Sequence, residues 1–168
     1  MMDKDNVFLW IKAAVAGLCG AFTAAFGWLG WLVVAWVVCM AIDWISGSAA
    51  AAAKGEWSSA VARAGIWHKG GMILVVLVAA VVDNVLALAV PHLPGLNISY
   101  TSLVLPVILV WYIFTELGSI AENAADMGAP VPAGLLKLLA AGKQLAGEQM
   151  APDDDSEEDD PKEDELKE

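Results

Sequence analysis

Residues 70–90 read GGMILVVLVAAVVDNVLALAV, an apolar run in which Asp83 is the only ionisable side chain. A helix needs about 20 residues, at roughly 1.5 Å each, to cross about 30 Å of hydrocarbon. The whole chain is 58% apolar and only 17% charged, and its mean hydropathy is +0.61. This run therefore predicts a membrane-spanning helix, and the composition predicts that lipid surrounds most of the chain.

Three further runs are apolar and long enough to cross or nearly cross a bilayer, at residues 7–26, 28–45 and 102–118. The sequence thus predicts an all-α membrane protein with about four transmembrane helices. Two glycines in the segment 27–30 offer the flexible backbone of a tight hairpin between the first two runs. One long bent helix and a shallow re-entrant hairpin stay open as alternatives, and without a fully spanning hairpin three spans would remain.

Lysine and arginine predict the orientation, because they are retained on the cytoplasmic side of short loops. In the four-helix arrangement they lie on one side, in the N-terminal segment 1–6, in a loop at 46–69 and after residue 118. Lys12 can reach that side by snorkelling, and the loop at 91–101 contains neither residue type. We therefore expect a multi-pass protein of a bacterial cytoplasmic membrane, with both termini in the cytoplasm and the loop 91–101 outside.

The C-terminal third is expected to leave the membrane. Residues 119–151 are predicted as cytoplasmic helices that break near Gly128 and the two following prolines, with a short helix at 133–147. Residues 152–168 hold eleven acids and two lysines, which accounts for −9 of the net charge of −11. Such a tail is predicted to be disordered, and its charge argues against a nucleic-acid partner.

The sequence shows no pattern typical of an enzyme or a metal protein. Cys19 and Cys39 lie inside apolar runs without CxxC spacing, so neither a disulfide framework nor a metal site is indicated. His68 and His92 are predicted on opposite sides of the membrane, and no nucleophile motif or phosphate-binding glycine loop occurs. We expect a non-catalytic protein without cofactor or metal.

Three acids lie in or beside the apolar runs. Asp83 is about 20 Å along its run, at a depth where a carboxylate costs on the order of 3 kcal/mol. It is predicted to line a pore or to control assembly, and the alternative is a protonated acid hydrogen-bonded within the fold. Asp43 and Glu116 come near the cytoplasmic ends of their runs, at the depth of Lys69, and are predicted to form ion pairs rather than a transport path.

The first run separates its residues by size. Large side chains occupy one face, and small residues occupy the opposite face at helical spacing. Small faces let helix backbones approach closely in lipid, so this face is predicted to pack against another helix, in the same chain or in a second copy. Its members are Ala13, Ala16, Gly17, Gly20, Ala21 and Ala24.

Several motifs follow one another in order. DWISG at 43–47 ends the second run, KGEWSS at 54–59 precedes Lys69, and ELGSIAEN at 116–123 leads into GAPVP at 128–132. Together they resemble the toxin-secretion/phage-lysis holin family, with its Asp-x-x-Thr/Ser-Gly, Lys-x-Gly-x-x-Ser-Ser and Glu-x-x-Ser-Ile-x-Glu-Asn segments. The second motif is one residue shorter here, and the acidic tail differs from the more basic tails of many relatives. The residues that carry the resemblance are Asp43, Ser46, Gly47, Lys54, Gly55, Ser58, Ser59, Lys69, Glu116, Glu122, Asn123, Gly128, Pro130 and Pro132.

The resemblance implies a phage or prophage holin, a protein that oligomerises in the cytoplasmic membrane and opens lesions. Its functional partners would then be the lipid bilayer, further copies of itself, and an endolysin or toxin that leaves the cell. Two alternative functions remain open. The first is a small ion channel or transporter that uses Asp83, and the second is a membrane anchor that docks a partner.

Overall fold

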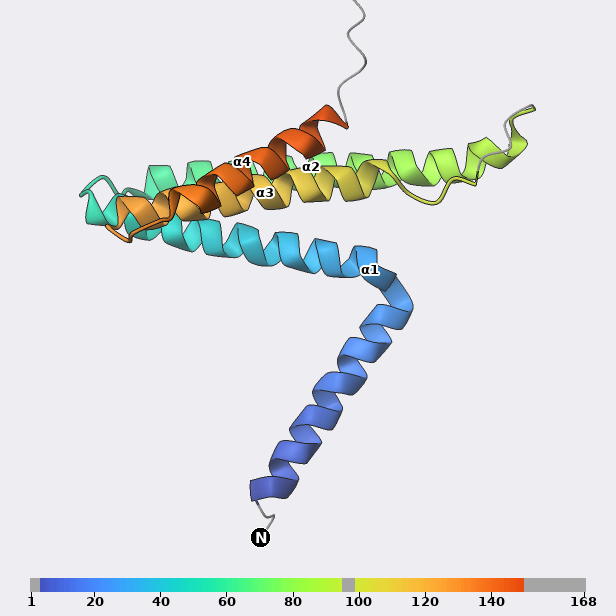
Figure 1. The fold of residues 1–168 in the computed structure, drawn as a ribbon, viewed down its shortest axis with the longest axis horizontal. Helices are drawn as coiled ribbons and strands as arrows, with labels where there is room; N and C mark the ends of the chain where they lie inside the picture. The colour runs from blue at the N-terminus through green and yellow to red at the C-terminus, as the bar shows by residue number, and fades with distance from the viewer. Residues whose placement is uncertain (1–3, 95–98, 150–168) are drawn as a thin grey trace, which may run out of the picture.

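The computed structural model describes residues 4–94 and 99–149, and these residues form helices and their connections, with no strand among them. Three of the helices are long and apolar enough to cross a membrane, which confirms the predicted all-α class. The elements are α1 (Lys4–Ala53), α2 (Ser59–Ala89), the short 3-10 helix η1 (Val90–His92), α3 (Val104–Asp126) and α4 (Ala133–Glu148) (Figure 1).

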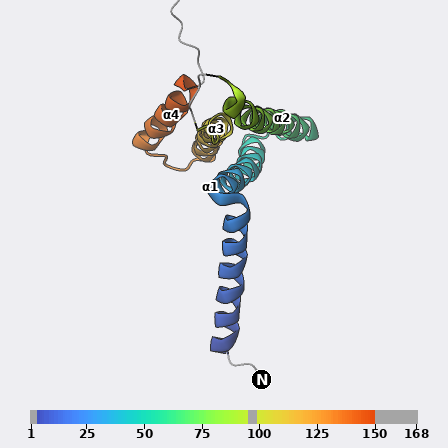
Figure 2. The same cartoon turned by 90° about the vertical axis from the view of Figure 1, so that its right-hand side faces the viewer.

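Helix α1 is bent at Gly27, and its two halves form an open V (Figure 1). Gly27 has φ 61° and ψ −157°, a backbone conformation that a residue with a Cβ rarely adopts. The predicted tight hairpin is therefore replaced by the bent helix that the sequence left open. The physical reason is local: only Gly27 leaves the helical conformation, and its dihedral angles hold the two halves as an open V in this structure. The first half projects away from the other helices in both views (Figure 2).

The second half of α1 packs with α2 and α3 into a three-helix bundle. Buried positions on α2 alternate steps of three and four residues, which is the spacing of a helix that keeps one stripe toward its neighbours. The Trp36 ring of α1 stacks on Tyr112 of α3, with centroids 6.0 Å apart. The core consists of Trp36, Met40, Met72, Val76, Leu109 and Tyr112.

The segment expected as a loop at 46–69 is mostly helical. Helix α1 continues to Ala53, where Gly55 with φ 73° ends it, and α2 begins at Ser59. Ser58 is the N-cap of α2, because its hydroxyl accepts a hydrogen bond of 3.2 Å from the Val61 N–H. Ser58 of the KGEWSS motif therefore starts α2 by satisfying one of its first backbone N–H groups.

Helix α4 confirms the short helix expected at 133–147, and it lies along α3 rather than apart from it (Figure 1). The Lys143 ammonium lies 5.0 Å from the centroid of the Trp111 ring. A Cβ at Gly142 would collide with the Phe114 ring, so glycine permits this close approach. The cytoplasmic location of residues 119–151 stays a prediction, and the acidic tail 152–168 lies outside the described residues.

Candidate functional site

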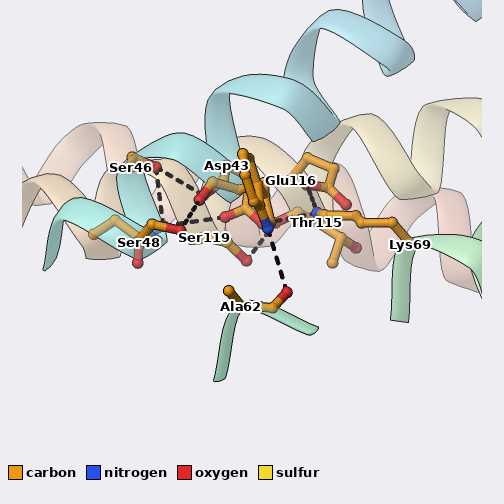
Figure 3. A network of polar contacts seen from close by, with 10 residues as sticks. Asp43, Ser46, Ser48, Ala62, Lys69, Thr115, Glu116 and Ser119 are labelled. Carbon is orange, nitrogen blue, oxygen red and sulfur yellow. Dashed lines mark hydrogen bonds and ion pairs between the residues drawn. The ribbon is translucent and has the colours of Figure 1, made fainter. Parts of the chain in front are cut away.

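Lys69 of α2 joins the three helices of the bundle through two carboxylates. Its ammonium lies 2.7 Å from a carboxylate oxygen of Asp43 on α1 and also pairs with Glu116 on α3 (Figure 3). The three side chains are 15%, 18% and 2% exposed for Lys69, Asp43 and Glu116. The ion pairing predicted for these acids is formed, and it ties one residue from each helix to a single point.

Two polar residues extend this ion pair group into a network. The Asn123 side-chain amide donates hydrogen bonds to Asp43 at 3.1 Å and to the Ser46 hydroxyl at 3.0 Å. Ser46 in turn donates to the Asp43 backbone carbonyl at 3.1 Å. Gly47 lies against the Asn123 side chain, and a Cβ there would be 3.4 Å from the amide nitrogen, an ordinary van der Waals contact. We call Asp43, Ser46, Lys69, Glu116 and Asn123 the Lys69 cluster.

The charges in the Lys69 cluster do not balance when all three groups are ionised, because two carboxylates share one ammonium. A buried ion pair is expensive to form, but removing one partner is more expensive still, since it leaves an uncompensated charge. The cluster can therefore fix the relative position of three helices without adding much net stability. Within the described ranges, no group of His, Cys, Asp and Glu side chains could hold a metal ion.

The other motif residues mark where helices begin and end. Lys54 and Gly55 follow the end of α1, while Ser58 and Ser59 begin α2. Lys54 also forms an exposed ion pair of 2.7 Å with Asp126 at the end of α3, and this contact raises the pKa of the Lys54 ammonium. The remaining positions are an exposed residue of α3 and three turn residues between α3 and α4: Glu122, Gly128, Pro130 and Pro132.

A second buried acid, Asp83, caps the opposite end of the bundle. It is 6% exposed and lies fourteen residues after Lys69, about 21 Å along α2. The first N–H groups of a helix have no partner inside that helix, and α3 has no side-chain cap of its own. Asp83 accepts hydrogen bonds from the Tyr100 and Ser102 hydroxyls and from the backbone N–H groups of Leu103, Val104 and Leu105, at 2.7 Å for Ser102 and 2.8–3.1 Å for the backbone.

These contacts change the interpretation of Asp83. The prediction favoured a pore-lining or assembly role, but the side chain is hydrogen-bonded within the fold, as in the alternative. All five partners are donors, so they favour the ionised carboxylate rather than the protonated acid of that alternative. Its bond with Tyr100 raises the pKa of that phenol, which therefore keeps its proton at neutral pH. Asp83 joins α2 to the start of α3.

The sequence did not predict the hydrogen-bond partners of Asp83 or the contact of Asn123 with Asp43. Nothing in the sequence indicated that Tyr100 and Ser102 would reach back to Asp83, or that Asn123 would contact Asp43 across 80 positions. One signal was present: Lys69, Met72, Val76, Ala79 and Asp83 follow steps of three and four residues. That spacing places both ionisable residues on the same stripe as the core of α2.

We predict that replacing Lys69 destabilises the protein strongly. Lys69→Met leaves Asp43 and Glu116 buried without a cation, and this should lower the free energy of unfolding by about 3–5 kcal/mol. Thermal unfolding in detergent measures the loss. Lys54→Met, which removes only an exposed pair, should change it little. The double variant Lys69→Met/Glu116→Leu should recover much of the loss, and no recovery would contradict the proposed cause.

We predict that Asp83→Asn loosens the start of α3. An amide offers one oxygen to five donors and turns its NH2 group toward them, so the free energy of unfolding should fall by roughly 2 kcal/mol or more. Hydrogen exchange at the Val104 and Leu105 amides should accelerate. The neighbouring exposed variant Asn84→Ala is the control. Equal exchange in both variants would show that Asp83 is not the cap.

Comparison with known proteins agrees with the resemblance found in the motifs. A model of the bacteriophage holin family matches residues 20–144. The uncharacterized protein BH0965 of Halalkalibacterium halodurans is 34% identical over 130 residues, which cover 77% of this chain and 86% of that protein. An uncharacterized 14.9 kDa protein in the nagH 3′ region of Clostridium perfringens is 30% identical over 141 residues, covering 84% and 96%. No solved structure gives a significant match. The matched region contains the bundle, the Lys69 cluster and the Asp83 cap, and this chain belongs to the bacteriophage holin family.

Proposed function

We propose that this protein is a holin that oligomerises in the cytoplasmic membrane and permeabilises it, so that an endolysin, or a toxin, leaves the cell. The observation that carries the proposal is the first half of α1. It is as long as a membrane span, yet it packs against no other helix of the bundle. Together with membership of the family, an apolar helix without a partner supports assembly with further copies.

The small face of this half supports the same proposal. Gly17 and Gly20 have no neighbouring atom within 4 Å of where a Cβ would stand, and Ala13, Ala21 and Ala24 are exposed. This face was expected to pack against another helix of the same chain or against a second copy. Among the described residues, no helix of the same chain packs against it. A second copy is therefore the better candidate, because small residues let two helix backbones approach closely in lipid.

Asp83 gives little support to a selective channel or transporter. A conducting acid must exchange protons or ions with a pathway, whereas the Asp83 carboxylate already accepts five hydrogen bonds within the fold. The anchor hypothesis depends mostly on the tail, which lies outside the described residues. Permeabilisation by assembled copies is the function that the geometry supports best.

We predict that induced expression of the protein alone collapses the membrane potential abruptly, because no enzyme is needed to open the membrane. Gly17→Ile should delay the collapse or abolish it, since a branched side chain separates the packed helices. Cys19→Ile adds a branched side chain on the other side of the helix from Gly17 and is the control. A potential-sensitive dye follows both. Normal growth at high expression of the wild type would contradict the proposal.

In a bilayer, the position of α4 beside α3 would place charged side chains of α4 in hydrocarbon. Lys143 and Glu148 lie beside the half of α3 that contains Trp111, and a charged side chain at hydrocarbon depth costs about 3 kcal/mol. Leu138 and Leu145 form an exposed apolar stripe on α4. We propose that α4 lies on the cytoplasmic surface of the membrane with this stripe toward lipid.

The orientation of α4 is tested by labelling a cysteine in a chain whose native Cys19 and Cys39 are alanine. Gln144→Cys should react with a membrane-impermeant maleimide in inverted vesicles but not in intact spheroplasts, before the membrane potential collapses. Val78→Cys, exposed in the middle of α2, should react in neither because lipid covers it. Labelling of Gln144→Cys in intact spheroplasts would place α4 outside and overturn the proposed orientation.

A further inference from the structure

The inner corner of the α1 bend is already closed by specific contacts. The Trp31 indole N–H donates a hydrogen bond of 2.9 Å to the Thr23 hydroxyl. The rings of Phe22 and Trp31 meet edge to face with centroids 5.0 Å apart. Beyond them, Leu18 and Val34 line a cleft of about 200 Å³ between the two halves. The corner is therefore the beginning of a helix pair that continues no further in this structure.

Both halves expose large apolar side chains along the inside of the V. On the first half these are Phe8, Ile11, Val15 and Leu18, each more than half exposed. On the second half, the core residues Trp36 and Met40 face the bundle, and the opposite side exposes a matching stripe. That stripe consists of Val34, Val38, Ile42 and Ile45, which are 37–61% exposed.

The two stripes are in register. Phe22 already contacts Trp31. From this contact, successive steps of seven, four and three residues toward the N-terminus on the first half are matched by equal steps toward the C-terminus on the second half. Antiparallel helices meet in this way when one closes onto the other. The matched pairs are Val15 with Val38, Ile11 with Ile42, and Phe8 with Ile45.

We propose that in the membrane the first half of α1 closes onto the outward face of its own second half and becomes a fourth span. The hinge is Gly27, because it alone leaves the helical conformation and two dihedral angles there set the opening of the V. The partner is the same chain rather than a second copy, because the connection through one residue holds the two faces at a high effective concentration. The apolar run 7–26 of this half has 20 residues, and its length of about 30 Å matches the hydrocarbon thickness.

Closure also places Lys12 at the same depth in the membrane as the charged residues near the cytoplasmic ends of the other spans. Lys12 lies fifteen residues before Gly27, about 22 Å along the helix. In the closed hairpin it would stand beside Ile42, at the height of Asp43 and the Lys69 cluster. Lys4 and Lys12 would then lie on the same side of the membrane as Lys54 and Lys69, as the retention of basic residues in the cytoplasm requires.

Closure would also decide which way the small face of the first half points. It lies opposite the stripe of Phe8, Ile11 and Val15, so closure buries the large side chains and leaves Gly17 and Gly20 on the lipid-facing side. The closed hairpin thus presents the surface proposed above for assembly. The closure itself depends only on the bilayer and not on permeabilisation, so the two proposals can fail separately.

Disulfide formation tests the closure in native membranes, in full-length chains with Cys19→Ala and Cys39→Ala. We expect Val15→Cys/Val38→Cys and Phe8→Cys/Ile45→Cys each to form an intramolecular disulfide on mild oxidation, detected as a faster-migrating monomer. Gly17→Cys/Val38→Cys is the matched control, because Gly17 lies on the opposite face. The disulfides should also form when Gly17→Ile is added and permeabilisation is lost.

Two results would overturn the closure. Val15→Cys/Val38→Cys could crosslink no faster than the Gly17 control, which would mean that α1 stays open in the bilayer. The pairs could also yield only disulfide-linked dimers, which would assign the outward face of α1 to a second copy. Absence of permeabilisation by the wild-type chain, with intact intramolecular crosslinks in the cysteine pairs, would contradict the holin function and leave the closure standing.

Discussion

A single ammonium group between two carboxylates holds this fold together at one end. Lys69 contacts Asp43 on α1 and Glu116 on α3. These contacts fix the position of each helix along the bundle axis relative to the other two. In lipid, apolar side chains lose little by contacting lipid instead of each other, so helices slide and rotate more easily than in water. A buried polar network resists this because each displaced partner would remain unsatisfied in hydrocarbon.

The Asp83 cap sets the other end of the same stripe. Its carboxylate receives the first N–H groups of α3, so α2 and α3 are joined at two points about 21 Å apart. Between these points Met72 and Val76 pack against Leu109 and Tyr112. The first half of α1, which precedes Gly27, is the one long helical segment of the described residues that does not pack in this bundle. The structure thus consists of a bundle held at two points and an arm that packs against no other helix of the bundle.

The sequence predicted the parts that depend on local pattern. The apolar runs predicted the long helices, and the helix predicted at 133–147 is α4. The pairing of Asp43 and Glu116 with Lys69 followed from their common depth. What depends on distant contacts was not predictable, because Tyr100 and Asn123 find their acids only after the helices pack. The preferred pore-lining or assembly role of Asp83 stays a prediction, to which the structure adds five hydrogen bonds within the fold. The expected hairpin is a bend at Gly27 in this structure.

The arrangement of the three helices depends most on the Lys69 contacts in a bilayer. Solid-state NMR of the protein in lipid, with ¹⁵N in the lysine side chains and ¹³C in the glutamate carboxyls, measures this proximity directly. We predict a through-space correlation between the Lys69 ammonium nitrogen and the Glu116 carboxyl carbon, absent in Glu116→Gln. A folded, helical sample in bilayers without this correlation would contradict the central claim that one lysine joins the three helices.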